Sequence, residues 1–300
     1  RRPEIGRVTM NSNGLRLADD PDLCRRLGEM GVHVILSFNT FDSTMSVKLH
    51  GRDVVESKLR AIDNLTRAGV KMTLLNVLIR DTNESAIEGI LKLMRNNDQI
   101  LSLTVQTMTY TGQGGGKAAE RRHIPVDEAA AIVCGQSGGA LVPGDFVTRP
   151  SAHPLCYLPC YMLKSGARWL PFARFAPPEK LASWMADSYL IRLEGEEVFF
   201  KDAINDLYAR GQDEQLKLFR GLIDMLYPPA ETLSVFERQK RAESSVRTVY
   251  VHAHMDEDNF DCSRAMMCPD LVPAEPGRLV PACTYNLFYR MEDERFYVKG

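Results

Sequence analysis

The segments VHVILSF (residues 32–38) and KMTLLNVLI (residues 71–79) are nearly continuous apolar runs. Such runs are typical of strands that are buried on both faces of a parallel sheet. Between them, residues 52–68 place apolar side chains three or four positions apart, which predicts an amphipathic helix that ends at Gly69. A strand, a helix and a second strand in this order predict a βαβ unit with a right-handed crossover.

The same alternation extends in both directions along the chain. Toward the N-terminus, residues 7–10 predict a short strand, and residues 21–30 predict a helix that begins at a proline. Toward the C-terminus, residues 84–95 predict a helix capped by Asn83, and residues 100–108 predict a fourth strand. Four strands that alternate with helices predict an α/β fold with a parallel sheet, either doubly wound or part of a barrel.

The pattern changes after Tyr110. The segment TGQGGGK (residues 111–117) lacks the spacing and the final hydroxyl residue of a triphosphate-binding loop, so we expect an active-site loop or a plain connector. Residues 126–134 predict a helix, residues 179–240 a largely helical region, and residues 247–254 a further strand.

The composition excludes several classes of protein. The chain has 37 Lys and Arg residues against 39 Asp and Glu residues, whereas a nucleic-acid-binding protein typically has a basic excess. No apolar run approaches the roughly 20 residues that a membrane-spanning helix needs, and the first residues lack the apolar segment of a signal peptide. Seven cysteines cannot all pair with one another, which favours a reducing compartment. We therefore expect a cytoplasmic protein with no nucleic-acid partner and no membrane span.

Five of the seven cysteines fall into two groups, one around CYLPC and one in the last forty residues. Grouped thiols in a chain of this class are more often metal ligands than disulfides. Thiolates that converge from loops can hold an iron–sulfur cluster, a tetrahedral zinc site is the nearest alternative, and buried thiols that act as small apolar side chains are the third. The predicted metal ligands are Cys156, Cys160, Cys262, Cys268 and Cys283. The other two, Cys24 and Cys134, lie in predicted helices and are expected in the core.

Polar residues stand where the predicted strands end. Because the carboxyl ends of parallel strands meet at one edge of a sheet, where ligands bind in such folds, these side chains suit a ligand with amino, carboxylate and ribose groups. Arg80 can bind a carboxylate with both arms of its guanidinium. The alternative is that polar residues simply end strands. The residues are Asn11, Asn13, Ser37, Asn39, Asn76, Arg80, Gln106 and Tyr110.

Two further groups have a functional and a structural interpretation. His252 and His254 share one face of a predicted strand and precede the acidic run 256–261, which can form a metal site, although a solvated acidic loop is the more usual arrangement. Trp169, Phe172 and neighbouring aromatic residues can line an apolar substrate channel, but packing in the core is the more common role.

Several segments together resemble radical S-adenosylmethionine enzymes. They are TMNSNGLRLADDPDL (9–23), VILSFNTFD (34–42), HPLCY (153–157) and GRLVPACTYNLFYR (277–290). Within that superfamily the chain is most similar to the branch that holds pterin dimethyltransferase-like proteins and tetraether lipid synthases, and the similarity extends over nearly the whole chain.

This resemblance implies a fold and a division of the chain. Residues 1–122 would form a partial (β/α)6 barrel whose first βα units are missing from this chain, and residues 123–300 a mostly helical region with auxiliary iron–sulfur cysteines. The family's CxxxCxxC motif occurs nowhere in the 300 residues, so we expect the catalytic cluster motif outside this chain. Relatives often carry a cysteine where Ser151 stands and a cysteine pair at Cys268 and Pro269. We therefore expect an auxiliary cluster that is altered or lost in part, with Cys160 or Cys262 as a substitute ligand.

The resemblance also implies a chemistry. In this family a [4Fe–4S] cluster reduces S-adenosylmethionine to a 5′-deoxyadenosyl radical, which abstracts hydrogen from an unactivated carbon. We expect methylation or C–C coupling of a lipid or other apolar substrate, with a one-electron donor such as ferredoxin or flavodoxin. The alternatives are a catalytically silent binding module and a zinc-dependent α/β barrel enzyme. By position, the cofactor would be bound by Asn11, Asn13, Ser37, Asn39, Arg80 and Gln106.

Overall fold

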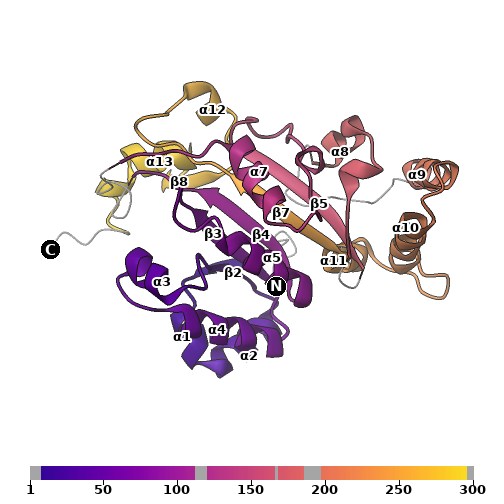
Figure 1. Cartoon of the computed structure of the whole chain (residues 1–300), viewed down its shortest axis with the longest axis horizontal. Coiled ribbons are helices and arrows are strands. Elements are labelled where there is room, and N and C mark those ends of the chain that lie inside the picture. The colour runs from indigo at the N-terminus through magenta and orange to yellow at the C-terminus, as the bar shows by residue number, and fades with distance from the viewer. Residues whose placement is uncertain (1–7, 112–119, 166–167, 186–196, 296–300) are drawn as a thin grey trace.

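The computed structural model describes residues 8–111, 120–165, 168–185 and 197–295 (Figure 1). Within these residues, seven strands form one sheet in the order β1-β2-β3-β4-β7-β5-β6. The first four strands and β7 are parallel, whereas β5 and β6 run antiparallel to their neighbours. The strands are Thr9–Ser12 (β1), His33–Ser37 (β2), Met72–Leu78 (β3), Ile100–Thr107 (β4), Tyr157–Ser165 (β5), Arg168–Pro171 (β6) and Val246–His252 (β7). The predicted α/β class with a mostly parallel sheet is confirmed.

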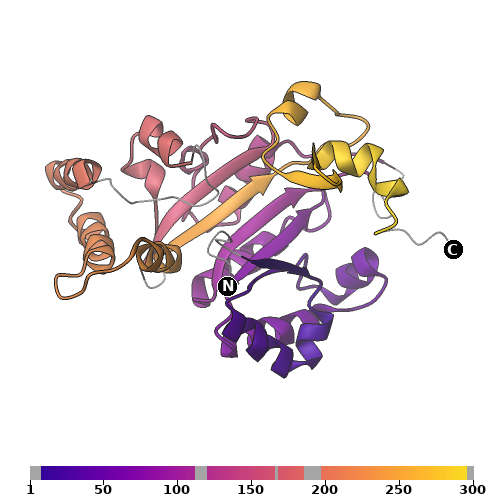
Figure 2. The same ribbon diagram turned by 180° about the vertical axis from the view of Figure 1, so that it is seen from behind.

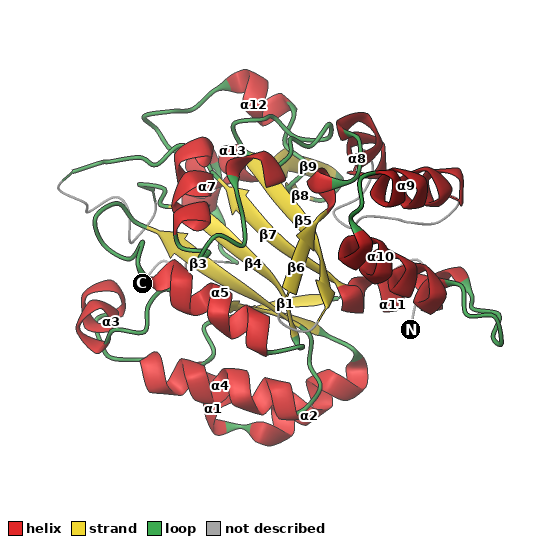
Figure 3. Cartoon of the chain, turned by 45° about the vertical axis from the view of Figure 1, so that its right-hand side comes forward, coloured by secondary structure: helices red, strands yellow, loops and turns green. Residues whose placement is uncertain are grey.

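Helices connect the parallel strands and cover one face of the sheet, as α5 and α7 do in Figure 3. Local sequence explains their ends: Asp20 Oδ1 accepts a hydrogen bond from Leu23 N at 2.9 Å at the start of α2, and Gly31 ends that helix with a φ of 66°. These helices are Leu15–Asp19 (α1), Pro21–Met30 (α2), Ser43–His50 (α3), Val55–Arg67 (α4), Ala86–Asn96 (α5) and Val126–Gly135 (α7).

The two faces of the sheet differ in character. The helix-covered face is apolar and forms the main core, with Leu74, Leu103 and Val249 fully buried between the strands and the helices. The opposite face, here called the polar face, carries Ser102, Thr104 and Gln106 of β4 and their in-register neighbours Thr248, Tyr250 and His252 of β7. Figure 2 looks onto that side of the sheet, where β4 and β7 lie next to each other.

The C-terminal half of the chain completes the sheet. Strand β7 lies between β4 and β5, and its register joins Ser102 to Thr248 and Cys160 to Val249. The sheet therefore continues across residue 122, where the sequence predicted a division of the chain.

A second core packs against the far part of the sheet. Tyr161 and Leu163 of β5 belong to one apolar cluster with Phe172, Leu207 and Phe219, which come from a short turn and from two C-terminal helices. The predicted helical region is present within the described residues, as Pro178–Met185 (α8), Glu197–Ala209 (α9), Asp213–Leu226 (α10) and Val235–Ser245 (α11). The aromatic residues Phe172 and Phe175 belong to this core, as the structural interpretation predicted.

The last described segment lies at the carboxyl edge of the sheet. It contains Cys262–Met266 (α12), Leu271–Glu275 (β8), Arg278–Pro281 (β9) and Ala282–Phe288 (α13). Figures 1 and 2 show it beyond the end of β7. Arg264 Nη2 of α12 donates to the carbonyl of Ala253 at 3.1 Å, and Met255 N donates to Cys283 Sγ at 3.2 Å. The second bond places Cys283, one of the predicted metal-ligand cysteines, beside the end of β7.

Some local predictions differ from the structure. Asn83 does not cap α5: its Oδ1 accepts from Ile79 N at 2.8 Å, and its Nδ2 donates to the carbonyls of Val77 and Asn39. The side chain thus closes the turn after β3 instead of starting the helix. The strand expected at residues 7–10 is observed as β1, at Thr9–Ser12. Arg7 and nearly all of the glycine-rich segment 111–117 lie outside the described residues.

None of the helices in the described part of the chain combines the length and the apolar character needed to cross a membrane.

Candidate functional site

Three of the predicted cofactor-binding residues share the polar face. The strand register puts Asn11 of β1, Ser37 of β2 and Gln106 of β4 on this side of the sheet. Asn11 is exposed, whereas Ser37 and Gln106 are half-buried. They stand at or near the carboxyl ends of their strands, which is the edge where ligands bind in parallel α/β sheets.

Ser37 is held by a buried lysine of the neighbouring helix. Lys58 Nζ donates to the Ser37 carbonyl at 2.6 Å and lies 2.8 Å from Ser37 Oγ. The lysine side chain comes from α4 and is 4% exposed. Burial lowers the pKa of Lys58 to about 8. A readily neutralised cation therefore lies directly behind one of the predicted cofactor contacts.

Asn13 and Asn39 bond to the backbone of their own chain. Asn13 Oδ1 accepts from Leu15 N at 3.1 Å at the start of α1. Asn39 Oδ1 accepts from Val77 N at 2.8 Å, and its carbonyl accepts from Asn76 Nδ2 at 3.2 Å. These bonds fix the loops after β1 and β2, so any contact of these two side chains with a ligand would use their remaining amide donors.

Arg80 already has a carboxylate partner within the chain. Its two arms donate to the two oxygens of Glu128 at 2.6 and 2.7 Å, and Nη2 also donates to the carbonyl of His123. The hydrogen bond to Arg80 lowers the pKa of the Glu128 carboxyl. The predicted two-armed geometry is therefore present, but in this structure it joins the turn after β3 to α7, and a ligand carboxylate would have to compete with Glu128.

A row of polar and aromatic side chains crosses the end of the sheet. Gln106, His252 and Tyr157 are aligned in register on β4, β7 and β5. The Tyr157 ring stacks on the His252 ring with 4.0 Å between centroids, and the His254 ring lies 4.1 Å from that of His252. Burial lowers the pKa of both histidines, that of His252 well below its usual value. Their imidazoles are therefore neutral near pH 7, which is the form that binds metals.

Three of the five predicted ligand cysteines meet beside this row. Cys156 precedes β5, Cys268 follows α12 and Cys283 lies in α13. Burial raises the pKa of Cys283 to about 11, and the nearby thiols of Cys268 and Cys156 also raise it. The pKa of Cys268 is raised by burial as well, with a contribution from Cys156. Residues more than one hundred positions apart thus contribute thiols to one neighbourhood.

Nitrogen donors surround these sulfur atoms. His254 Nδ1 is 3.4 Å and Met255 N is 3.2 Å from Cys283 Sγ, and Arg264 Nε donates to Cys156 Sγ at 3.3 Å. Hydrogen bonds and a positive charge directed at sulfur favour its negatively charged forms. The sequence pattern did not single out Arg264, because nothing local shows that α12 packs against the end of β7.

The remaining two candidate cysteines lie elsewhere. Cys160 is buried in the main core on the helix-covered face of β5, where burial raises its pKa well above the usual value. Cys262 is exposed at the start of α12. Cys24 is buried in α2, as predicted for a core thiol, and Cys134 is partly buried in α7.

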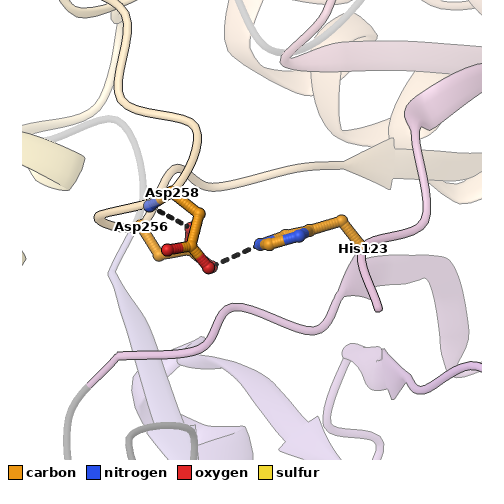
Figure 4. A group of neighbouring side chains, drawn as sticks. All are labelled: His123, Asp256 and Asp258. Atoms are coloured by element: carbon orange, nitrogen blue, oxygen red, sulfur yellow. Dashed lines mark hydrogen bonds and ion pairs between the residues drawn. The ribbon is translucent and has the colours of Figure 1, made fainter. Parts of the chain in front are cut away.

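A second cluster at this edge joins Asp256 of the acidic run to His123, which the sequence pattern did not single out. Asp256 is fully buried, and Figure 4 shows its carboxylate directed at His123. Its Oδ2 is 2.7 Å from His123 Nε2 and accepts from Tyr110 N at 2.8 Å, while Asp258 N donates to Oδ1 at 3.1 Å. The expectation of a solvated acidic loop is therefore wrong for Asp256, because three donors compensate its burial.

This second cluster could hold a cation in principle. One ligand atom from each of His123, Asp256 and Asp258 lies within 4.8 Å of the others. However, Asp256 already accepts three hydrogen bonds, and Asp258 Oδ1 accepts from Arg121 at 3.0 Å. The oxygens are thus occupied by protein donors, and the cluster mainly joins the loop before α7 to the loop after β7.

Comparisons with known proteins agree with the observed fold. Residues 1–94 match the family model of the radical SAM superfamily. The 7,8-dihydro-6-hydroxymethylpterin dimethyltransferase of Methanocaldococcus jannaschii is 24% identical over an alignment that covers 97% of this chain. The chain spans 63% of the length of that relative.

Proposed function

This chain is a member of the radical SAM superfamily, and on that premise we propose that it supplies part of the S-adenosylmethionine site and an auxiliary [4Fe–4S] site of an enzyme that functionalises an unactivated C–H bond. The proposed reaction is methylation or C–C coupling. The name of the relative, a dimethyltransferase, supports methyl transfer.

The observation that carries the proposal is the meeting of Cys156, Cys268 and Cys283 at the carboxyl edge of the sheet. Their mutual influence on pKa values indicates that the three thiols are near one another. The neighbouring Arg264 and the Met255 amide direct positive charge or N–H groups at the sulfur atoms. Such donors to ligand sulfur are a common feature of iron–sulfur sites.

Within the described residues, the three cysteines and His254 do not form a ready-made site for one tetrahedral metal ion. Thiolates around one tetrahedral zinc lie about 3.8 Å apart, given a Zn–S distance of about 2.3 Å. Within the described residues, no three ligand atoms drawn from these cysteines and His254 lie within 4.8 Å of one another. Thiolates on a [4Fe–4S] cluster are farther apart because each binds a different iron. The zinc alternative therefore requires these ligands to move closer together, whereas the iron–sulfur proposal rests on the three cysteines and on the N–H donors beside them.

The residues at the strand ends suit the proposed cofactor only in part. Asn11 and Gln106 present side chains on the polar face, and Ser37 lies beside Lys58. S-adenosylmethionine, when reduced at the family's catalytic cluster, supplies the radical that removes hydrogen from a substrate. The chain's own residues would orient that ligand by hydrogen bonds to its polar groups, with Arg80 available once Glu128 is displaced.

Two substrate classes follow from different observations. The resemblance to lipid synthases favours a lipid or another apolar molecule. The name of the relative favours a pterin-like heterocycle. Such a ligand carries hydrogen-bonding groups, which suit the polar face with its residues Thr104, Gln106 and Tyr250. A one-electron donor such as ferredoxin or flavodoxin would supply the electron in either case.

Iron content and cofactor cleavage test the proposal. The native protein that carries this chain, reconstituted anaerobically with iron and sulfide, should be brown and should cleave S-adenosylmethionine. Replacement of Cys283 or Cys156 by Ser should remove about four iron atoms per chain, because a thiolate ligand of the auxiliary cluster is lost. Cys262→Ser, at an exposed thiol outside the group, is the matched control and should keep the full iron content.

The other possible outcomes would favour the alternative functions of this chain. A colourless protein with neither iron nor cleavage would reject the proposal, one zinc and no iron would favour a zinc enzyme, and bound iron without cleavage would favour a silent binding module. Deuterium transferred from a labelled pterin or a labelled lipid into 5′-deoxyadenosine would identify the substrate class.

A further inference from the structure

The amino edge of the sheet, opposite to the carboxyl edge, contains a cavity of about 370 Å³. It lies where α5 ends, where β4 and β7 begin and where β5 ends. Its charged lining consists of Arg95, Asp98, Lys164 and Arg247. Strand β7 has seven residues, so about 20 Å separates this cavity from His252 at the other end of the strand. The cavity is therefore separate from the proposed cofactor site.

Arg247 brings a buried charge to this cavity. Its side chain is 2% exposed. Its guanidinium donates to the carbonyl oxygens of Ser244, Val246 and Asp98 at 2.7 to 3.2 Å. Carbonyl oxygens carry no net charge, so these bonds satisfy donors without neutralising the cation. A guanidinium remains protonated even where burial lowers its pKa, as it does here.

The single carboxylate of the lining is shared between two cations. Asp98 Oδ1 is 2.6 Å from Lys164 Nζ and 3.5 Å from an arm of Arg247. The Asp98 side chain is 80% exposed, so water screens its interaction with both partners. A buried cation without a close counter-charge is costly. Asp98 neutralises the cations of the lining only in part, so an anion bound in the cavity would stabilise them.

Arg95 adds a third cation and an unused donor. Its guanidinium lies over the Trp169 ring, 4.8 Å from the centroid. Among the described residues it forms no ion pair. The Nε atoms of Arg95 and Arg247 are both buried and have no hydrogen-bond partner in the described part of the chain. The protein shields these two atoms from the cavity, but the terminal nitrogens of Arg95 form no hydrogen bond with any described residue, so they remain available to an acceptor that comes from outside the protein.

We propose that this cavity binds a small oxyanion whose binding group is a phosphate. A phosphate offers several acceptor oxygens and up to two negative charges, which match the arginine donors and the excess of cations. The cavity volume falls within the range of small-molecule sites. Free phosphate and the phosphate group of a larger metabolite share this chemistry.

Titration calorimetry at constant ionic strength tests the proposal on the native protein, with inorganic phosphate, pyrophosphate and chloride as the probes. Phosphate or pyrophosphate should bind saturably and chloride should not. Arg95→Gln should weaken binding about tenfold, the loss of roughly one charged hydrogen bond. Lys92→Gln removes the same charge from an exposed position of α5 and should leave the affinity unchanged.

Asp98→Asn separates a binding effect from a folding effect. It removes the competing carboxylate, so it should tighten phosphate binding about tenfold, which a poorly folded variant cannot do. Tighter binding of pyrophosphate than of phosphate would identify a larger phosphorylated ligand, and equal binding would identify free phosphate. The absence of saturable binding, or equal affinity in all variants, would overturn the proposal. Because no iron or S-adenosylmethionine enters the measurement, it is independent of the proposed enzymatic activity.

Discussion

At the carboxyl ends of the strands, charged side chains are buried against specific partners. Lys58 lies behind Ser37, and Asp256 accepts hydrogen bonds from His123 and from the loops on either side. Nothing in the sequence indicated that Lys58 would be buried, and Asp256 stood in an acidic run for which a solvated loop was the more usual arrangement. Burial changes their chemistry because it penalises the charged form unless partners compensate.

Lys58 should make the stability of the protein depend on pH. Burial lowers its pKa from 10.5 to about 8, so between these values the unfolded chain binds the proton more tightly than the folded chain does. The contribution of Lys58 to the free energy of unfolding is therefore unfavourable below pH 8 and becomes less so as the pH rises to about 10.5, by about 3 kcal/mol in total.

Urea denaturation of the wild type and of Lys58→Met measures this effect. The difference between the two free energies of unfolding should rise in favour of the wild type from pH 8 to 10.5, and the subtraction removes contributions from cysteines that titrate in the same range. Lys48→Met, at an exposed lysine of α3, is the control. A difference that stays constant over this range would show that Lys58 is not buried as described.

At the scale of elements, the close packing of α2 against α4 depends on one glycine. A Cβ atom at Gly28 would lie 2.4 Å from the carbonyl oxygen of Ala68, which follows α4. Backbone atoms cannot move aside as a flexible side chain can, so the two helices would have to separate. This contact lies behind β1 and β2, whose ends carry part of the proposed cofactor site.

Gly28→Ala should destabilise the protein by about 1–3 kcal/mol, which is typical of overpacking. Gly135→Ala provides the matched control, because Gly135 is also helical and an added Cβ there meets nothing within 4 Å. It should raise stability by about 0.5 kcal/mol, since alanine restricts the unfolded chain. Equal effects of the two substitutions, measured by urea denaturation, would contradict the described packing.

At the scale of the whole molecule, the chain forms its sheet from both halves. Strand β7 covers the edge of β4 over five in-register pairs, from Ser102–Thr248 to Gln106–His252. The division at residue 122, which the family resemblance implies, remains a prediction. The sheet crosses that position, and the carboxyl edge of β7 brings the C-terminal cysteines to the ends of the N-terminal strands.

A fragment of residues 1–122 should therefore not fold as a stable monomer. Removal of residues 123–300 exposes the edge of β4 and the apolar side chains Leu103 and Val105, which invites association with other chains. Size-exclusion chromatography with light scattering should show aggregates, and co-expression with residues 123–300 should restore a soluble complex. A monomeric fragment with one sharp urea transition would instead support two separate domains.

Much of the fold could be predicted from local sequence. The helix predicted at residues 21–30 is α2 with the same bounds, and the apolar runs at 71–79 and 100–108 are β3 and β4 within one residue at each end. Helix α1 was not predicted, because it has only five residues and shows no full period of apolar positions. The helical cap proposed for Asn83 failed because the same side chain also suits a turn.

The sequence by itself determined the α/β class, the positions of the first four strands along the chain and the candidate ligand residues, because periodicity, capping and residue chemistry are local properties of a chain. Only the tertiary structure decided that β7 joins β4, that three cysteines meet beside His254 while Cys160 and Cys262 do not, and that Arg80 is paired with Glu128. Those outcomes depend on contacts between residues far apart in the chain, whose burial and register no local pattern encodes.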